Sequence, residues 1–105
     1  MVWTSQTSAG RRDSELATLL REVKIVNKYG LHARPAMQFV EIANRFNCKI
    51  EVANGPLVVD AKSIMSVMRL AATKGTILRI VADGEDAQAA IEALEKLVTE
   101  GFGEE

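Results

Sequence analysis

Four segments of the chain have the apolar pattern of strands. In the first segment Val23 and Ile25 lie on one side and Lys24 on the other, and the second segment alternates in the same way. Because successive side chains of a strand point to opposite faces of a sheet, this pattern predicts half-buried strands. The predicted strands cover residues 22–27, 48–52, 57–60 and 76–82.

A tight turn joins the second and third predicted strands. Asn54 and Gly55 lie between them, and both residue types adopt the positive backbone angles that a two-residue hairpin needs. Pro56 begins the third strand and has no backbone N–H to donate to a neighbour. The third strand is therefore predicted to lie at the edge of an antiparallel sheet.

Apolar residues recur at helical spacing in three further segments. The first helix is expected to begin near residues 32–34 and to run to Phe46, because Pro35 is well tolerated in a first helical turn. The second covers residues 62–72. The third is capped by residues 83–86 and ends at Gly101.

The order of these elements is strand, helix, strand, strand, helix, strand, helix. All three helices are available to cover one face of the sheet. Residues 22–105 are therefore predicted to form an α/β (α+β) fold, an open-faced sandwich with a four-stranded antiparallel sheet. Residues 1–21 are predicted to be an extension, with a flexible tail over 1–12 and one short amphipathic helix over 13–21.

Composition narrows the possible functions. The 105 residues allow one domain, and 13 Lys and Arg against 14 Asp and Glu give a net charge of −1, which provides no general attraction to nucleic acid or anionic membranes. Cys48 is the single cysteine, and motifs for nucleotides, dinucleotides and zinc are absent, so neither a cofactor nor a metal is expected. Without an apolar run of about 20 residues or a secretory signal, we expect a cytoplasmic protein.

One histidine lies in an unusual setting. His32 falls at the predicted start of a helix, where the amides of Ala33 and Arg34 are available to bind an anion. Arg34 adds a guanidinium suited to two phosphate oxygens. A lone histidine more often has a structural or solvent-facing role. Its neighbours favour instead a histidine that accepts a phosphoryl group and passes it on.

These residues carry a family resemblance. Residues 30–36, with the sequence GLHARPA, resemble the active-site signature of the HPr family of histidine-containing phosphocarriers, which belong to the phosphoenolpyruvate-dependent sugar phosphotransferase system. Residues 60–68 resemble the regulatory-serine segment of that family, and residues 72–76 and 84–86 match as well. The resemblance covers residues 22–105 and implies the HPr-like fold.

The resemblance also implies roles for single residues. Enzyme I, charged by phosphoenolpyruvate, would phosphorylate Nδ1 of His32, and Arg34 would steady the phosphoryl group. The acceptor would be the A component of a sugar-specific enzyme II, and a carrier that binds two partners in turn is expected to be a monomer. This is a covalent carrier of a phosphoryl group rather than a stand-alone enzyme.

Ser63 has two interpretations. Its hydroxyl can simply cap the second helix. By resemblance it would be a regulatory site phosphorylated by an HPr kinase/phosphorylase. A phosphate there would place negative charge beside the apolar residues of that helix and weaken docking.

The second helix has a second apolar side, which is more than a short helix needs to pack on a sheet. We expect these residues, with Met37 of the first helix, to dock partner proteins. The alternative for Met65 and Met68 is that they fill gaps in the core. The expected docking residues are Met37, Ile64, Met65 and Met68.

One departure leaves the acceptor open. Tyr29 stands where sugar-branch members usually have a small polar residue, and residues 27–32 also resemble the nitrogen-related branch, whose carrier phosphorylates a regulatory protein. A kinase-controlled regulator not coupled to sugar uptake is a further alternative. A ligand-binding module of ferredoxin-like topology would share the order of elements but would not explain residues 30–36.

Overall fold

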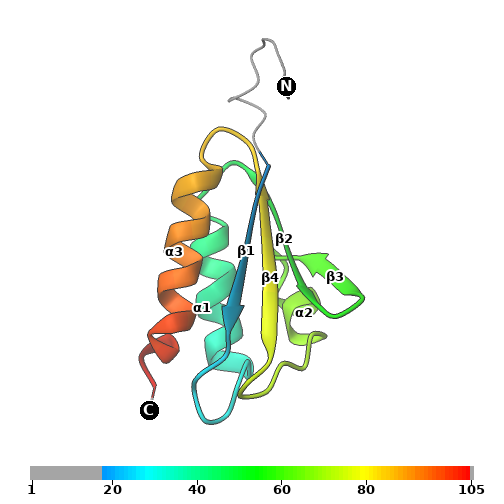
Figure 1. Ribbon diagram of the computed structural model, residues 1–105, viewed down its shortest axis with the longest axis vertical. Coiled ribbons are helices and arrows are strands. Elements are labelled where there is room, and N and C mark those ends of the chain that lie inside the picture. The colour runs from blue at the N-terminus through cyan, green and yellow to red at the C-terminus, as the bar shows by residue number, and fades with distance from the viewer. Residues whose placement is uncertain (1–17, 105) are drawn as a thin grey trace.

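The computed structural model describes residues 18–104 and contains one four-stranded sheet (Figure 1). The strands are β1 (Thr18–Lys24), β2 (Lys49–Asn54), β3 (Leu57–Asp60) and β4 (Ile77–Asp83). Their order is β1-β4-β2-β3, and every neighbouring pair is antiparallel. The predicted sheet is thus confirmed, and β3 lies at its edge as Pro56 indicated.

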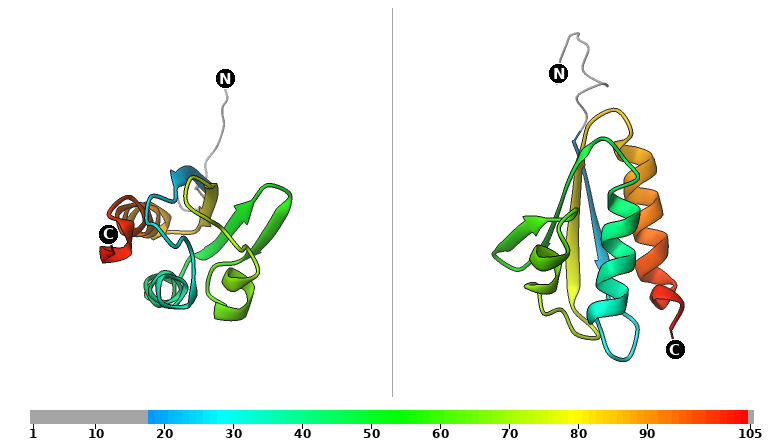
Figure 2. Two further views of the ribbon diagram at one scale, coloured as in Figure 1. Left: turned by 90° about the horizontal axis from the view of Figure 1, so that it is seen from below. Right: turned by 180° about the vertical axis from the view of Figure 1, so that it is seen from behind.

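The helices cover one face of this sheet. They are α1 (Ala33–Ala43), α2 (Ile64–Met68) and α3 (Ala87–Thr99), followed by a short 3-10 turn, η2 (Gly101–Gly103). Figure 2 shows α1 and α3 side by side, and α2 contacts α1 and β3. The core lies between the two layers, where Phe39, Ile80 and Leu94 are fully buried.

The first strand corrects one prediction. Residues 18–21 belong to β1, which pairs in continuous register with β4 from Thr18 to Lys24, whereas they were predicted to belong to a short helix. Leu19 packs against the core and Leu20 is exposed, as expected for alternate faces of a strand. The backbone of β4 gives these residues pairing partners that a local helix would leave unused. The rest of that predicted helix and the tail lie outside the described residues.

The second helix is shorter than predicted. It runs for five residues rather than over 62–72, and the backbone then turns at Ala71, whose φ is +48°. The apolar pattern predicts a core face of Val67, Leu70 and Ala71, and this is confirmed for Val67 and Leu70, which are buried, but is wrong for Ala71, which is exposed.

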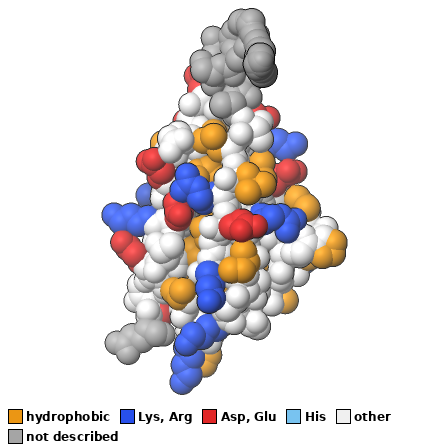
Figure 3. All heavy atoms as spheres, in the orientation of Figure 1, with side chains coloured by type: hydrophobic (Ala, Val, Ile, Leu, Met, Phe, Trp, Pro, Cys, Tyr) orange, Lys and Arg blue, Asp and Glu red, His pale blue; other side chains and the backbone are white. Residues whose placement is uncertain are grey.

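Among the described residues, no helix covers the other face of the sheet. Figure 3 shows scattered apolar side chains there, separated by acidic and basic ones. Leu20 is among the exposed large apolar residues of the chain. This mixture is ordinary for the solvent face of an antiparallel sheet.

Candidate functional site

His32 occupies the N-cap position of α1. Its backbone is extended, its side chain makes no capping hydrogen bond, and 42% of that side chain is exposed. The next two amides, those of Ala33 and Arg34, have no acceptor within the helix, and Pro35 has no N–H. An exposed imidazole thus lies beside the positive end of a helix dipole, as the sequence predicted.

The loop before His32 is held by the backbone of a distant segment. The amide of Leu31 donates to the carbonyl oxygen of Ala72 over 2.9 Å. Gly30 has a φ of +66°, and a Cβ at this position would lie 2.4 Å from that same oxygen. Only glycine fits this approach, which fixes the start of α1 against residues 72–73.

A carboxylate from the C-terminal end of the chain contacts the imidazole. Nε2 of His32 lies 3.0 Å from Oε2 and 3.2 Å from Oε1 of Glu104. Asn27, which is buried, donates from Nδ2 to Oε1 of the same carboxylate over 3.1 Å and to the carbonyl oxygen of Gly30 over 2.8 Å. The hydrogen bond from His32, then that from Asn27, lowers the pKa of Glu104 below its ordinary value, and the positive charge of Arg34 acts in the same direction.

The sequence interpretation missed both Glu104 and Asn27. Glu104 is 72 residues from His32 along the chain and belongs to no motif, and Asn27 was noted only as the first residue of the run 27–32, with no role of its own. Only the folded chain brings these side chains to the imidazole.

The ring of Tyr29 lies near the imidazole of His32. The two rings meet edge to face, with the centroids 6.3 Å apart and an interplanar angle of 89°. Tyr29 is 70% exposed, and Nζ of Lys28 lies 5.3 Å from the centroid of its ring. An aromatic side chain and a cation therefore form part of the surface that a partner would meet around His32.

Ser63 is the N-cap residue of α2. Its Oγ accepts a hydrogen bond from the amide of Ser66 over 3.3 Å, and the residue is partly buried. The capping interpretation is therefore confirmed. A regulatory role for the same hydroxyl stays a prediction.

Three of the four expected docking residues are exposed. Met65 is 76%, Met37 57% and Met68 40% exposed, whereas Ile64 is partly buried against the core. Met65 and Met68 are both among the exposed large apolar residues, so the alternative that these two methionines fill gaps in the core is wrong. Because α1 and α2 contact each other, the exposed methionines lie on neighbouring helices.

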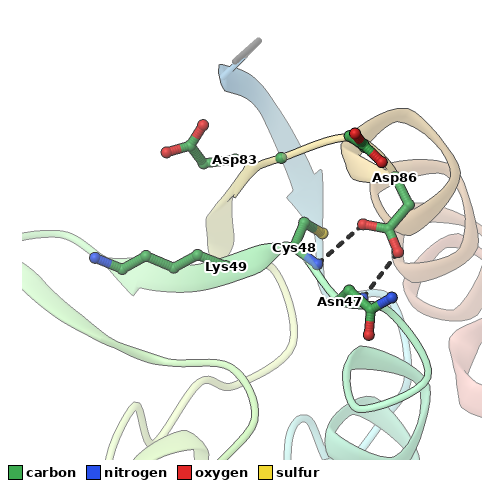
Figure 4. A pocket seen from close by; sticks show the side chains of 7 residues that line it. Asn47, Cys48, Lys49, Asp83 and Asp86 are labelled. Carbon is green, nitrogen blue, oxygen red and sulfur yellow. Dashed lines mark hydrogen bonds between the residues drawn. The ribbon is translucent and has the colours of Figure 1, made fainter. Parts of the chain in front are cut away.

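A hollow of about 570 Å³ is lined by residues 47–49 and 83–86. Figure 1 shows the start of β2 and the connection from β4 to α3 at the opposite end of the molecule from the loop before α1. Figure 4 shows the carboxylate of Asp86 accepting hydrogen bonds from the amides of Asn47 and Cys48, at 2.8 and 2.9 Å. These bonds, with that of Asn47 first, lower the pKa of Asp86. Burial, followed by the hydrogen bond to Asp86, raises the pKa of the Cys48 thiol to about 11.

The hydrogen bonds of Asp86 beside this hollow therefore connect the start of β2 to the start of α3. Asp86 is the N-cap residue of α3, within the predicted cap at residues 83–86. Its side chain makes no capping hydrogen bond, because the carboxylate binds the amides of Asn47 and Cys48 instead. Among residues 18–104, no group of three or more His, Cys, Asp and Glu side chains is placed to hold a metal ion. None of the helices in the described part of the chain is long and apolar enough to span a membrane.

Comparison with known proteins agrees with this geometry. The family model described as the PTS HPr component phosphorylation site matches residues 19–100. The phosphocarrier protein HPr of Pseudomonas putida is 48% identical over 85 residues, which cover 80% of this chain and 94% of that protein.

Solved structures of the family have the same fold. HPr-C-His from Thermoanaerobacter tengcongensis superposes with a TM-score of 0.80 at 42% identity, covering 83% of this chain and 98% of that one. A structure described as an HPr dimer from the same organism has a TM-score of 0.67 at 44% identity, covering 78% and 94%.

Proposed function

The chain belongs to the HPr family and is a phosphocarrier of the phosphotransferase system, and from this we propose that His32 carries the phosphoryl group on Nδ1. The observation that supports this most directly is the arrangement of the ring. Nε2 is bound to Glu104, and no partner of Nδ1 is found among residues 18–104. A ring nitrogen without such a partner, on a side chain that is 42% exposed at a helix N-terminus, suits a phosphoryl acceptor.

The transfer itself needs few protein groups. The lone pair of Nδ1 attacks phosphorus on charged enzyme I, the new N–P bond forms as the old one breaks, and the electron pair of the broken bond returns to enzyme I. In the second transfer, a nucleophile of the A component of enzyme II attacks the same phosphorus. The N–P bond to His32 breaks, and its electron pair returns to Nδ1. The guanidinium of Arg34 and the amides of Ala33 and Arg34 receive the phosphoryl oxygens, because transfer depends chiefly on positioning and charge stabilisation.

Mass spectrometry of the intact chain tests this proposal. Incubation with enzyme I of the same organism and phosphoenolpyruvate is expected to add one phosphoryl group that brief acid treatment removes. The His32→Ala variant is expected to stay unmodified. Absence of the addition in the native chain, or its presence in the variant, would overturn the proposal.

Docking and regulation are proposed for the surface around α2. Exposed methionines adapt to partner surfaces of different shape. Met37 on α1 and Met65 and Met68 on α2 supply such a surface. Phosphorylation of Ser63 by an HPr kinase/phosphorylase would add negative charge beside it. The protein then works as a cytoplasmic monomer that binds enzyme I and its acceptors one after another.

Tyr29 supports a second candidate for the acceptor. A large ring edge-on to His32 restricts the space in which an acceptor's own histidine must approach. A regulatory protein of the nitrogen-related branch is therefore the alternative to a sugar-specific A component. Incubating the phosphorylated chain with each class of acceptor separates them, since the true acceptor removes the phosphoryl group from His32 much faster than hydrolysis does.

A further inference from the structure

In the hydrogen bond between His32 and Glu104, the donor and the acceptor can be assigned. An ionised carboxylate only accepts hydrogen bonds, so a bond between Nε2 and the Glu104 oxygens requires the proton to be on Nε2. A neutral imidazole carries one ring proton. With that proton on Nε2, the lone pair is left on Nδ1, the nitrogen at which transfer is proposed.

The fold holds this carboxylate in place. After α3 the chain turns through η2, where Phe102 is 97% buried and adopts a left-handed backbone with φ +58°. Gly101 lies against Val26 and Asn27, the residues that follow β1. Figure 1 shows that this C-terminal end lies at the same end of the molecule as the loop before α1. The buried phenyl ring thus anchors the turn that carries Glu104.

Asn27 fixes the carboxylate from a second side. Its Nδ2 donates both to Oε1 of Glu104 and to the backbone of the site loop at Gly30. Since Asn27 is only 1% exposed, this side chain has little freedom to move. The Glu104 carboxylate therefore lies between a fixed amide and the imidazole, rather than moving freely in solvent.

We propose that Glu104 is a positioning residue for phosphoryl transfer: it holds the proton on Nε2, orients the ring so that Nδ1 faces the donor, and stabilises the positive charge that the ring gains. This inference rests on the proposed function. As the N–P bond forms, Nδ1 shares its lone pair and the imidazole becomes cationic. The hydrogen bond from Nε2 to the carboxylate then becomes an ion pair, so it is stronger in the transition state than in the ground state.

The first test is the position of the ring proton in the unphosphorylated protein. Long-range proton–nitrogen NMR on the full chain, with labelled histidine, distinguishes protonated from unprotonated ring nitrogens. The native protein at a pH where the ring is neutral is expected to show Nε2 protonated and Nδ1 unprotonated. In Glu104→Gln, whose amide can also donate to Nε2, a fraction with the proton on Nδ1 is expected to appear.

Glu100→Gln is the matched control. It removes one carboxylate near the same end of the chain from a residue that makes no hydrogen bond to His32, and it is expected to leave the native pattern of ring nitrogens. A role limited to stabilising the fold would leave the ring proton on Nε2 in Glu104→Gln. That result, or a mixed pattern in the native protein, would overturn the proposal.

The second test is the kinetics of phosphoryl acceptance from enzyme I. Loss of a hydrogen bond to a charged group predicts that Glu104→Gln lowers the maximal rate about tenfold. The concentration of carrier that half-saturates enzyme I is expected to stay the same, because docking is not affected. An unchanged maximal rate would overturn the proposal. If the native chain accepts no phosphate, the proposed function fails, whereas the NMR result still decides whether Glu104 sets the ring proton.

Discussion

At the scale of single residues, Gly30 sets the shape of the loop that carries His32. We predict that Gly30→Ala costs about 2 kcal/mol of unfolding free energy and slows phosphoryl acceptance, because the new Cβ would meet the Ala72 carbonyl oxygen at 2.4 Å. Gly55→Ala is the control, since Gly55 has a similar φ of +61° with nothing within 4 Å. Urea unfolding and phosphorylation rates measure both variants. An equal rate of phosphorylation in the two variants would contradict the prediction.

The sequence identified the residues of the site whose roles depend on local structure. His32 and Ser63 are N-cap residues, and such positions follow from the pattern of the next ten residues. Asn27 and Glu104 could not be found in this way. Their contact depends on η2, where Phe102 takes a left-handed backbone that its residue type does not predict.

At the scale of elements, α2 has two faces with different roles. We predict that Ser63→Asp raises the concentration at which the carrier half-saturates enzyme I by about tenfold, because the carboxylate lies beside the exposed methionines. Ser63→Ala also loses the side-chain cap to Ser66 but adds no charge, so it should keep near-native docking. Kinetics of phosphoryl acceptance compares the two. Equal docking by the Asp variant and the native chain would reject the switch.

The boundaries of the elements were predicted less well than their order. The apolar residues around Leu19 fit both helical spacing and strand alternation. This segment forms a strand because residues 18–24 pair with β4. For α2, the apolar pattern continues past Met68, but the left-handed turn at Ala71 ends the segment. In both cases a contact distant in sequence, or a backbone angle, decides where the element begins or ends.

At the scale of the whole molecule, two carboxylates join segments that are far apart in the chain, one at each end of the sandwich. Asp86 binds the amides before β2, and Glu104 binds Asn27 and His32. These contacts lower the pKa of both carboxyl groups. Folding therefore favours their ionised forms, and the stability of the fold is linked to pH through groups that also shape the site.

The sign of this link gives the last prediction. Near pH 4 the unfolded chain binds more protons at these two positions than the folded chain, so stability rises with pH there. The stabilisation from these two carboxylates is fully present above the ordinary pKa values of Asp and Glu. It is lost as the pH falls through the lowered pKa values that the two groups have in the folded state. Urea unfolding of the native chain is thus expected to give a smaller free energy at pH 3 than at pH 6.

The double variant Asp86→Asn with Glu104→Gln is expected to be less stable than the native chain at pH 6, with a smaller loss between pH 6 and pH 3. Both changes keep the size of the side chain while removing the charge that the lowered pKa values reflect. Glu100→Gln should keep the native dependence, because within residues 18–104 no hydrogen bond joins that carboxylate to a distant segment. An undiminished loss in the double variant would mean that other groups carry the acid sensitivity of the fold.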